Sequence, residues 1–414
     1  MNEIQSLLAA SLHSNDFGPF YDWLEERSCE NLKLRIHRML SRGEVQWLTN
    51  VYFSKLGEAS LDSLESKAKF ANQLLKQTSA NSPTESYSYP AVDMDIQQLR
   101  PSEIELRRIG QSGLFVSPVA LGCWPIAGMT SLGVNDEDSL ATISAALESG
   151  INFIDTAHCY GANGESERLI GKAIKGKRDR IVLASKGGIH WDEKGIRHYD
   201  ATPERILLEC NESLRRMNVD HIDLFYLHAP DPQVPVEQSA EAFVSLLKSG
   251  KVRAVGASNF SVEELEKFQA VCPISAVQPP YNMLERAIES DIIPWCIANH
   301  VSVINYWPLM KGLLAGKIRR GHQFEANDKR LTYDVFQGEK FEAAQKLLDR
   351  LDFMAVKTDK TVAQIVVNWT IHQPGLTATL CGAKRDWQIR ETAGGMGWKL
   401  DDADFHLINA LITS

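Results

Sequence analysis

The sequence of 414 residues has no excess of positive charge and no long hydrophobic run. It contains 44 Lys and Arg residues against 53 Asp and Glu residues, so its formal net charge is -9. A negatively charged chain has no overall field that would attract a nucleic acid backbone or an anionic membrane surface. No stretch approaches the roughly 18 apolar residues of a membrane-spanning helix. The sequence therefore predicts neither nucleic acid nor membrane as a partner.

Paired cysteines are also missing, because the seven cysteines are scattered along the chain and none forms a C-x-x-C motif. This spacing argues against a disulfide framework and against a structural zinc site, and we predict no metal. The N-terminal segment MNEIQSLLAASLHSNDF lacks the basic start of a secretion signal. We therefore expect a protein of the reducing cytoplasm.

The sequence does contain enough apolar residues for a large core, at 44% hydrophobic and 23% charged. In residues 1–77 the apolar positions recur at helical spacing, which predicts a small domain of roughly three or four helices. Residues 78–90 read TSANSPTESYSYP and show no apolar periodicity. We interpret residues 78–100 as a linker, followed by a second domain over residues 101–414.

In the second domain, short β-branched runs alternate with amphipathic helical patterns. Eight runs predict strands, at residues 116–122, 151–157, 180–186, 221–229, 252–258, 274–281, 301–309 and 377–383. Strands that are each followed by a helix indicate a (β/α)8 TIM barrel, here with an N-terminal all-helical extension. The alternative, a doubly wound sheet, lacks its G-x-G-x-x-G fingerprint. Residues 105–117, with a turn at Gly110 to Gly113, predict a hairpin that could close the barrel floor.

Polar residues at the carboxyl ends of barrel strands are the ones most informative about chemistry. The predicted second strand ends in Asp155, with Tyr160 five residues later, and the third and fourth end in Lys186 and His228. Any one of these could be an ordinary polar residue at a barrel rim. The interpretation as ordinary rim residues is much weaker for all four together, because they place an acid, a phenol, an ammonium group and an imidazole at one mouth.

These four groups suit the reduction of a carbonyl by hydride. The developing alkoxide needs a proton donor, and a phenol such as Tyr160 donates poorly unless a cation such as Lys186 stabilises its anion. Asp155 would pair with Lys186 and hold it in place, and His228 could donate a hydrogen bond to the carbonyl oxygen. Nucleophilic hydrolysis fits less well because no G-x-S-x-G elbow is present.

The segments GINFIDTAHCYG, IVLASKGG, HIDLFYLHAPD, GKVRAVGASNFS and QPPYN resemble successive blocks of the aldo-keto reductase superfamily. The resemblance runs from about Glu105 to the C-terminus. It implies an oxidoreductase that reduces the aldehyde or ketone group of a small molecule to an alcohol. It also implies that Asp155, Tyr160, Lys186 and His228 form the catalytic tetrad, with Tyr160 as general acid, and that NADPH binds across the barrel mouth without a Rossmann domain.

The same resemblance assigns residues to the cofactor. Ser258, Asn259 and Gln278 match positions that bind the nicotinamide carboxamide, and Tyr306 matches the aromatic residue that stacks on the nicotinamide ring. Further matched positions are Leu309, Gly382, Lys384, Arg385 and Gln388. The two cations favour NADPH through its 2′-phosphate, while NADH stays open. Trp307 and Gln388 depart from the family pattern, which more often has a small hydroxyl and an Arg there.

The sequence leaves some alternatives open. The chain could be an NADP-binding regulatory or scaffold protein whose N-terminal helices engage a protein partner, or it could self-associate through them. The adjacent residues Phe20, Tyr21 and Trp23 cannot all face the core of one small bundle. Trp124 and residues 189–192 could wall a substrate pocket or simply pack at the surface. The basic insertion after Gly316 could fold over the cofactor as a flap.

Overall fold

The computed structural model describes residues 104–128 and 133–413. All of them belong to the second of two compact units, Asp95–Ser414. The predicted helical domain 1–77 and the linker 78–100 lie outside the described residues and stay predictions.

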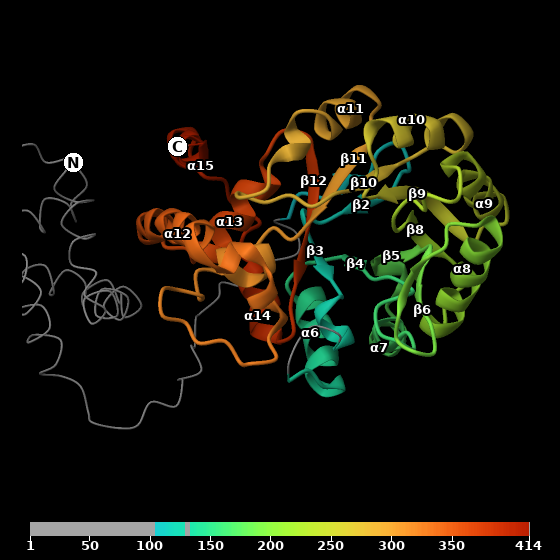
Figure 1. The fold of residues 1–414 in the computed structure, drawn as a ribbon, viewed down its shortest axis with the longest axis horizontal. Coiled ribbons are helices and arrows are strands. Elements are labelled where there is room, and N and C mark those ends of the chain that lie inside the picture. The colour runs from blue at the N-terminus through green and yellow to red at the C-terminus, as the bar shows by residue number, and fades with distance from the viewer. Residues whose placement is uncertain (1–103, 129–132, 414) are drawn as a thin grey trace, which may run out of the picture. The chain divides into compact units, whose positions relative to one another are not determined.

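Parallel strands form a closed eight-stranded barrel, as predicted (Figure 1). In barrel order the strands are β3 (Val119–Gly122), β4 (Phe153–Asp155), β5 (Val182–Gly187), β8 (Ile222–Leu227), β9 (Val252–Ser258), β10 (Ala276–Gln278), β11 (Ser302–Tyr306) and β12 (Leu376–Gly382). The barrel closes where β12 pairs in parallel with β3, with Thr379 opposite Val119. The apolar runs found in the sequence therefore became the strands. β9 has the predicted bounds, β12 is shifted by one residue, β5 ends one residue later than predicted, and the other strands are shorter than the runs that predicted them.

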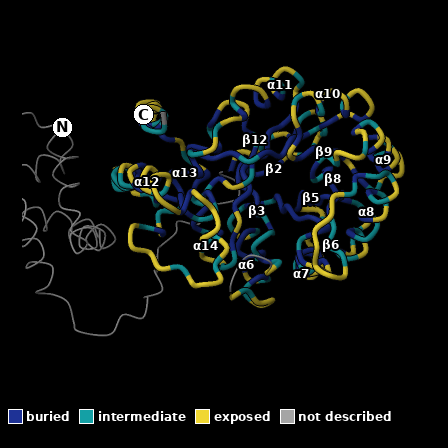
Figure 2. Tube along the Cα trace, viewed as in Figure 1, coloured by how far each residue is buried: buried dark blue, intermediate teal, exposed yellow. Residues whose placement is uncertain are grey.

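Helices surround the barrel and most of them expose an outer face, whereas the barrel strands and the whole of one helix, α13, are buried (Figure 2). They are α6 (Asp136–Glu148), α7 (Glu165–Ala173), α8 (Pro203–Met217), α9 (Val236–Lys248), α10 (Val262–Val271), α11 (Ile292–Ala298), α12 (Gly338–Thr358), α13 (Val362–Ile371), α14 (Asp386–Ala393) and α15 (Asp402–Thr413). Ser261 and Glu264 form the capping box that starts α10. Among the described residues, no helix is both long and apolar enough to cross a membrane.

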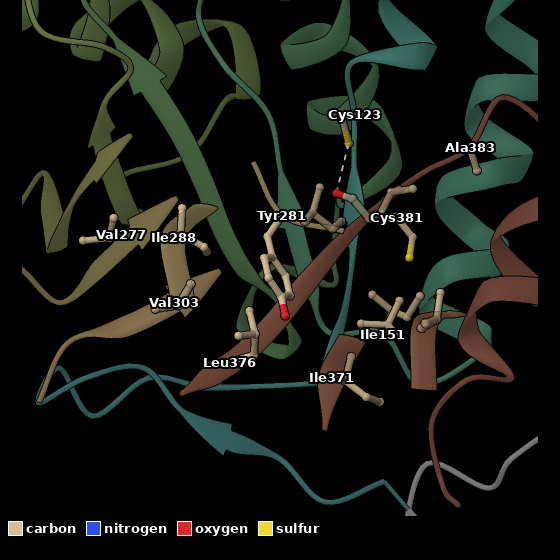
Figure 3. Packing of buried hydrophobic residues seen from close by; sticks show 14 of the residues in the cluster. Cys123, Ile151, Val277, Tyr281, Ile288, Val303, Ile371, Leu376, Cys381 and Ala383 are labelled. Atoms are coloured by element: carbon tan, nitrogen blue, oxygen red, sulfur yellow. Dashed lines mark hydrogen bonds between the residues drawn. The ribbon is translucent and has the colours of Figure 1, made fainter. Parts of the chain in front are cut away.

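A large buried cluster fills the space between the strands and the surrounding helices. Figure 3 shows part of it, where Cys123 and Cys381 of adjacent segments lie among aliphatic side chains from several strands and helices. A second cluster fills the barrel interior with residues such as Phe153, Leu224 and Ile304. The barrel is therefore solid, and any ligand must bind at one of its ends.

The predicted hairpin closes the end of the barrel where the strands begin. Its strands β1 (Arg107–Arg108) and β2 (Phe115–Val116) pair antiparallel, and Ile109 and Val116 belong to the interior cluster. Gly110 has a φ of +46° and donates its backbone N–H to Ser302 Oγ at 2.9 Å. With this end closed, the carboxyl ends of the strands form the open mouth.

Candidate active site

Three neighbouring strands bring the predicted catalytic groups to the mouth of the barrel. Asp155 is the last residue of β4, Lys186 is the penultimate residue of β5, and His228 directly follows β8. The backbone N–H of His228 donates to the carbonyl of Gly187 at 2.9 Å, which fixes the strand ends relative to one another. The strand-end rule thus explains why residues far apart in the sequence meet here.

Asp155 and Lys186 form a buried ion pair at the centre of the site. Lys186 Nζ donates to Asp155 Oδ1 at 2.5 Å and to the carbonyl of Thr156 at 2.7 Å, and both charged side chains are 1% exposed. Gln278 Nε2 donates to the other oxygen, Asp155 Oδ2, at 2.8 Å. Burial raises the pKa of Asp155 above its ordinary value, while Lys186 and Gln278 oppose that shift. The ammonium group is therefore held in one position.

Tyr160 reaches the same ammonium group from the loop after β4. Its hydroxyl oxygen lies 3.4 Å from Lys186 Nζ, and the edge of its ring meets Trp124 at 4.9 Å between centroids. Burial raises the pKa of the Tyr160 phenol well above its ordinary value, and the nearby Asp155 raises it further. The phenol is consequently protonated at neutral pH, as a proton donor must be before it acts.

His228 completes the group next to Tyr160, with ring centroids 5.9 Å apart. Its Nδ1 lies 3.5 Å from Cys159 Sγ. Burial, together with the positive charges of Lys186 and Arg197, holds the pKa of His228 well below its ordinary value. Burial also raises the pKa of the Cys159 thiol to about 12. At neutral pH both groups are uncharged.

The residues assigned to the nicotinamide form one hydrogen-bonded chain beside this group. Tyr306 donates its hydroxyl to Asn259 Oδ1 at 2.8 Å, and Asn259 Nδ2 donates to Ser258 Oγ at 3.1 Å. Ser258 Oγ in turn donates to the carbonyl of Gln278 at 2.8 Å. Amide and hydroxyl groups beside a partly exposed aromatic ring suit a carboxamide attached to a flat ring, so these residues fit a nicotinamide.

Three of the residues assigned to the phosphate end, Gly382, Lys384 and Arg385, end or directly follow β12 at the mouth of the barrel. Gly382 is in register with Gly122, which is in register with Asp155. Arg385 pairs with Asp138 of α6 at 3.0 Å and is only partly exposed. Two further residues were assigned to the cofactor. Gln388 Oε1 accepts a hydrogen bond from the backbone N–H of Lys384 at 2.9 Å, and Leu309 packs against the large core cluster.

Trp307, the residue that departs from the family pattern, is 40% exposed and has a φ of +60°. The edge of its ring meets Tyr306 at a centroid distance of 5.0 Å, and Lys311 Nζ lies over its face. Burial lowers the pKa of Lys311 to about 8. An aromatic platform with a cation therefore stands where the small hydroxyl was expected.

The sequence missed a small hairpin that forms one wall of the site. Strands β6 (Ile189–Trp191) and β7 (Arg197–Tyr199) pair antiparallel directly after β5. Trp191 Nε1 donates to the carbonyl of Cys159 at 2.8 Å. Two apolar-polar runs flanking a turn with Gly195, at a φ of +72°, were the available signal. Trp191 and Trp124 therefore stand at the site rather than at a remote surface.

The basic insertion after Gly316 is fastened to α12. Arg319 Nη2 is 2.7 Å from Asp352 Oδ2, and Arg320 pairs with Glu342 at 2.9 Å and Asp349 at 3.0 Å. These cations are therefore engaged by carboxylates of that helix. The role of the insertion as a flap stays a prediction.

Comparisons with known proteins agree with this arrangement. The profile of the Aldo/keto reductase family matches residues 118–413. Aldo-keto reductase YhdN of Bacillus subtilis (strain 168) is 39% identical over 313 residues, which cover 75% of this chain and 94% of that protein. Aldo-keto reductase str7 of Strobilurus tenacellus is 33% identical over 315 residues, covering 74% of this chain and 91% of that protein.

Two solved structures are similar in fold and sequence. Glycerol dehydrogenase AKR11B4 from Gluconobacter oxydans has a TM-score of 0.70 and 37% identity, covering 74% of this chain and 95% of that one. The holo form of aldo-keto reductase AKR11C1 from Bacillus halodurans has a TM-score of 0.63 and 25% identity, covering 74% of this chain and 96% of that one.

Proposed function

Because the chain belongs to the aldo/keto reductase family and is an oxidoreductase, we propose that it reduces aldehyde or ketone carbonyls to alcohols with NADPH. One observation carries the proposal most directly. Lys186 Nζ is bound to Asp155 and lies 3.4 Å from the Tyr160 hydroxyl oxygen at the open end of the barrel. This arrangement joins a proton donor to the cation that stabilises its anion.

NADPH, when bound, supplies the hydride. The hydrogen-bonded residues Ser258, Asn259 and Gln278 would hold the carboxamide of the nicotinamide. The Tyr306 ring would stack on the face of the nicotinamide ring. Leu309, Gly382 and Gln388 would flank the rest of the cofactor. Lys384 and Arg385 would bind the 2′-phosphate, which is the reason for favouring NADPH over NADH.

Tyr160 is the general acid in this proposal. Its raised pKa keeps the proton in place until the carbonyl oxygen becomes an alkoxide, which is a stronger base than a phenolate and takes the proton. Lys186 stabilises the phenolate left behind, and Asp155 keeps the Lys186 ammonium group near it. The name of the AKR11B4 glycerol dehydrogenase describes the opposite reaction, alcohol oxidation, for that protein. In that direction the proton would move from the alcohol to the Tyr160 phenolate.

His228 orients the carbonyl. As a neutral imidazole it can donate from one ring nitrogen only. The Cys159 thiol keeps its proton and can donate it to His228 Nδ1, which leaves the imidazole proton on Nε2. That proton would bind the carbonyl oxygen and stabilise the charge that develops on it.

The test is NADPH oxidation by the full chain with para-nitrobenzaldehyde, followed by absorbance. Tyr160→Phe removes only the hydroxyl, so we expect NADPH binding to stay near that of the wild type. Turnover should fall by roughly two to four powers of ten, the usual contribution of general-acid catalysis.

Wild-type turnover in the Tyr160→Phe variant would refute the role of Tyr160. Absence of any carbonyl turnover by the wild type, across a panel of aldehydes and ketones, would refute the proposed reaction itself.

A further inference from the structure

The hairpin formed by β6 and β7 presents two distinct faces. Trp191 is paired with Arg197, and Ile189 with Tyr199. Residues opposite one another in an antiparallel pair, and residues two apart on a strand, lie on the same face. Trp191, Arg197 and Tyr199 therefore share one face of the hairpin, while the stacked rings of His190 and His198 share the other.

The face with Arg197 is turned toward the catalytic groups. Trp191 is bound to the carbonyl of Cys159 and packs in one cluster with Tyr160. The charge of Arg197 acts on groups around the mouth, since it contributes to the lowered pKa of His228 and opposes the burial-driven rise in the pKa of Tyr306. The guanidinium group thus lies at the entrance, within electrostatic reach of both sides of the site.

Arg197 differs from the other arginines near these strand ends. Arg205 is bound to Glu209 at 2.8 Å, and Arg216 is bound to Glu167 at 3.1 Å. Within residues 104–128 and 133–413, no carboxylate pairs with Arg197, which is exposed and stacks on the Tyr199 ring at 5.0 Å from its centroid. A guanidinium group stacked on a ring keeps its N–H donors for a planar anion.

We propose that Arg197 is a specificity-determining residue that binds an anionic group of the substrate, so that the preferred substrates are carbonyl compounds carrying a carboxylate or a phosphate. The inference rests on the proposed function and names its substrate class. Trp191 is opposite Arg197 in the hairpin and packs in one cluster with Tyr160, and Trp124 meets the Tyr160 ring. These aromatic side chains suit the carbon chain or ring that joins the anionic group to the carbonyl.

Matched substrates test this directly. Meta- and para-formylbenzoate and their methyl esters have similar aldehydes but differ by one charge, and glyceraldehyde phosphate against glyceraldehyde tests the phosphate. For the wild type we expect kcat/KM about tenfold higher for the charged member of at least one pair. That ratio should fall as salt is raised.

The variants are Arg197→Gln and, as control, Lys194→Gln in the turn of the same hairpin. Lys194 is exposed and does not contribute to the pKa shifts of His228 or Tyr306. Arg197→Gln should lower kcat/KM for the charged substrate about tenfold more than for the neutral one, whereas Lys194→Gln should preserve the wild-type ratio. Arg197→Lys should restore part of the preference.

A second readout does not depend on turnover. Quenching of tryptophan fluorescence measures the binding of benzoate and of benzamide to the protein loaded with NADP+. Benzoate should bind more tightly, and Arg197→Gln should abolish the difference. If that pattern appears without any carbonyl turnover, the proposed function fails and anion recognition stands.

If the wild type reduces neutral and charged aldehydes equally well, the reductase stands and the role of Arg197 is overturned. A rise in the Kd of NADPH in Arg197→Gln, with equal losses for both members of each pair, would likewise overturn it, because Arg197 would then serve the cofactor.

Discussion

The Lys186 side chain of the Asp155–Lys186 pair makes several contacts at this site. Lys186 binds a carboxylate and a backbone carbonyl and also faces the Tyr160 hydroxyl, in a setting where both charges are 1% exposed. Desolvating two charges is costly, and such a pair is weak evidence of added stability. Its position fits a catalytic purpose better than a structural one.

We predict that Asp155→Asn lowers kcat roughly a hundredfold, since Lys186 is no longer held beside Tyr160. Leaving the ammonium group buried without its carboxylate should also lower the free energy of unfolding by about 3–5 kcal/mol. Single-turnover kinetics and urea unfolding measure the two effects. A variant with lowered stability and unchanged kcat would show that the pair is purely structural.

The two cations after β12, Lys384 and Arg385, have different contacts. Arg385 is held by Asp138, whereas Lys384 is fixed through its backbone by Gln388. We predict that Lys384→Ala together with Arg385→Ala raises KM for NADPH about tenfold and hardly changes KM for NADH, which lacks the 2′-phosphate. Equal losses with both cofactors would place these cations at the pyrophosphate.

Sequence and structure agree best on residues whose position follows from the barrel itself. Asp155, Lys186 and His228 were predictable because each lies within one residue of the carboxyl end of a strand, and these ends meet at one mouth. Arg197 was not predictable, because a charge in a short surface hairpin looks the same in sequence whether it faces solvent or a site. Only the pairing with Trp191 reveals its direction.

The sequence predicted strands most clearly where a run of consecutive residues is buried. Strands such as β9 are rich in apolar residues and stood out, whereas β6 and β7 have three residues each, and all of β7 is exposed. The 21-residue helix α12 follows the insertion that the sequence suggested as a flap, and it was not predicted. Its acids bind the arginines of that insertion, a contact between neighbouring segments that periodicity alone does not reveal.

The hairpin at the closed end offers a test at the level of elements. A Cβ on Gly110 would lie 2.4 Å from the carbonyl oxygen of Ser275, and its φ of +46° is already unfavourable for other residues. We predict that Gly110→Ala lowers the free energy of unfolding by about 2–3 kcal/mol. Urea unfolding measures it.

Gly113→Ala is the matched control for this hairpin. Gly113 also has a positive φ, of +79°, but nothing lies within 4 Å of the added Cβ. It should cost only about 1 kcal/mol, from backbone strain alone. Similar losses in both variants would mean that the contact with Ser275 relaxes and that only the conformation matters.

For the whole molecule, the barrel should be sufficient for cofactor binding. YhdN is matched over 94% of its length by 75% of this chain, so that relative has little beyond the shared region. We predict that a fragment of residues 100–414 folds and binds NADPH with the affinity of the full chain. Thermal melting and fluorescence titration measure this. An insoluble fragment, or one that has lost NADPH binding, would make the preceding residues part of the catalytic fold.

The closure of the barrel has a consequence for biosynthesis. One edge of β3 cannot pair until β12 has been synthesised, because Val119 pairs with Thr379, about 260 residues later in the chain. At roughly 5–20 residues per second, a ribosome needs tens of seconds to deliver that partner. Throughout this interval β3 offers an unpaired edge of Val119–Gly122, a template for wrong pairing in the nascent chain. The strands that position Asp155, Lys186 and His228 emerge well before then, so these residues can come together while Lys384 and Arg385 are still to be translated.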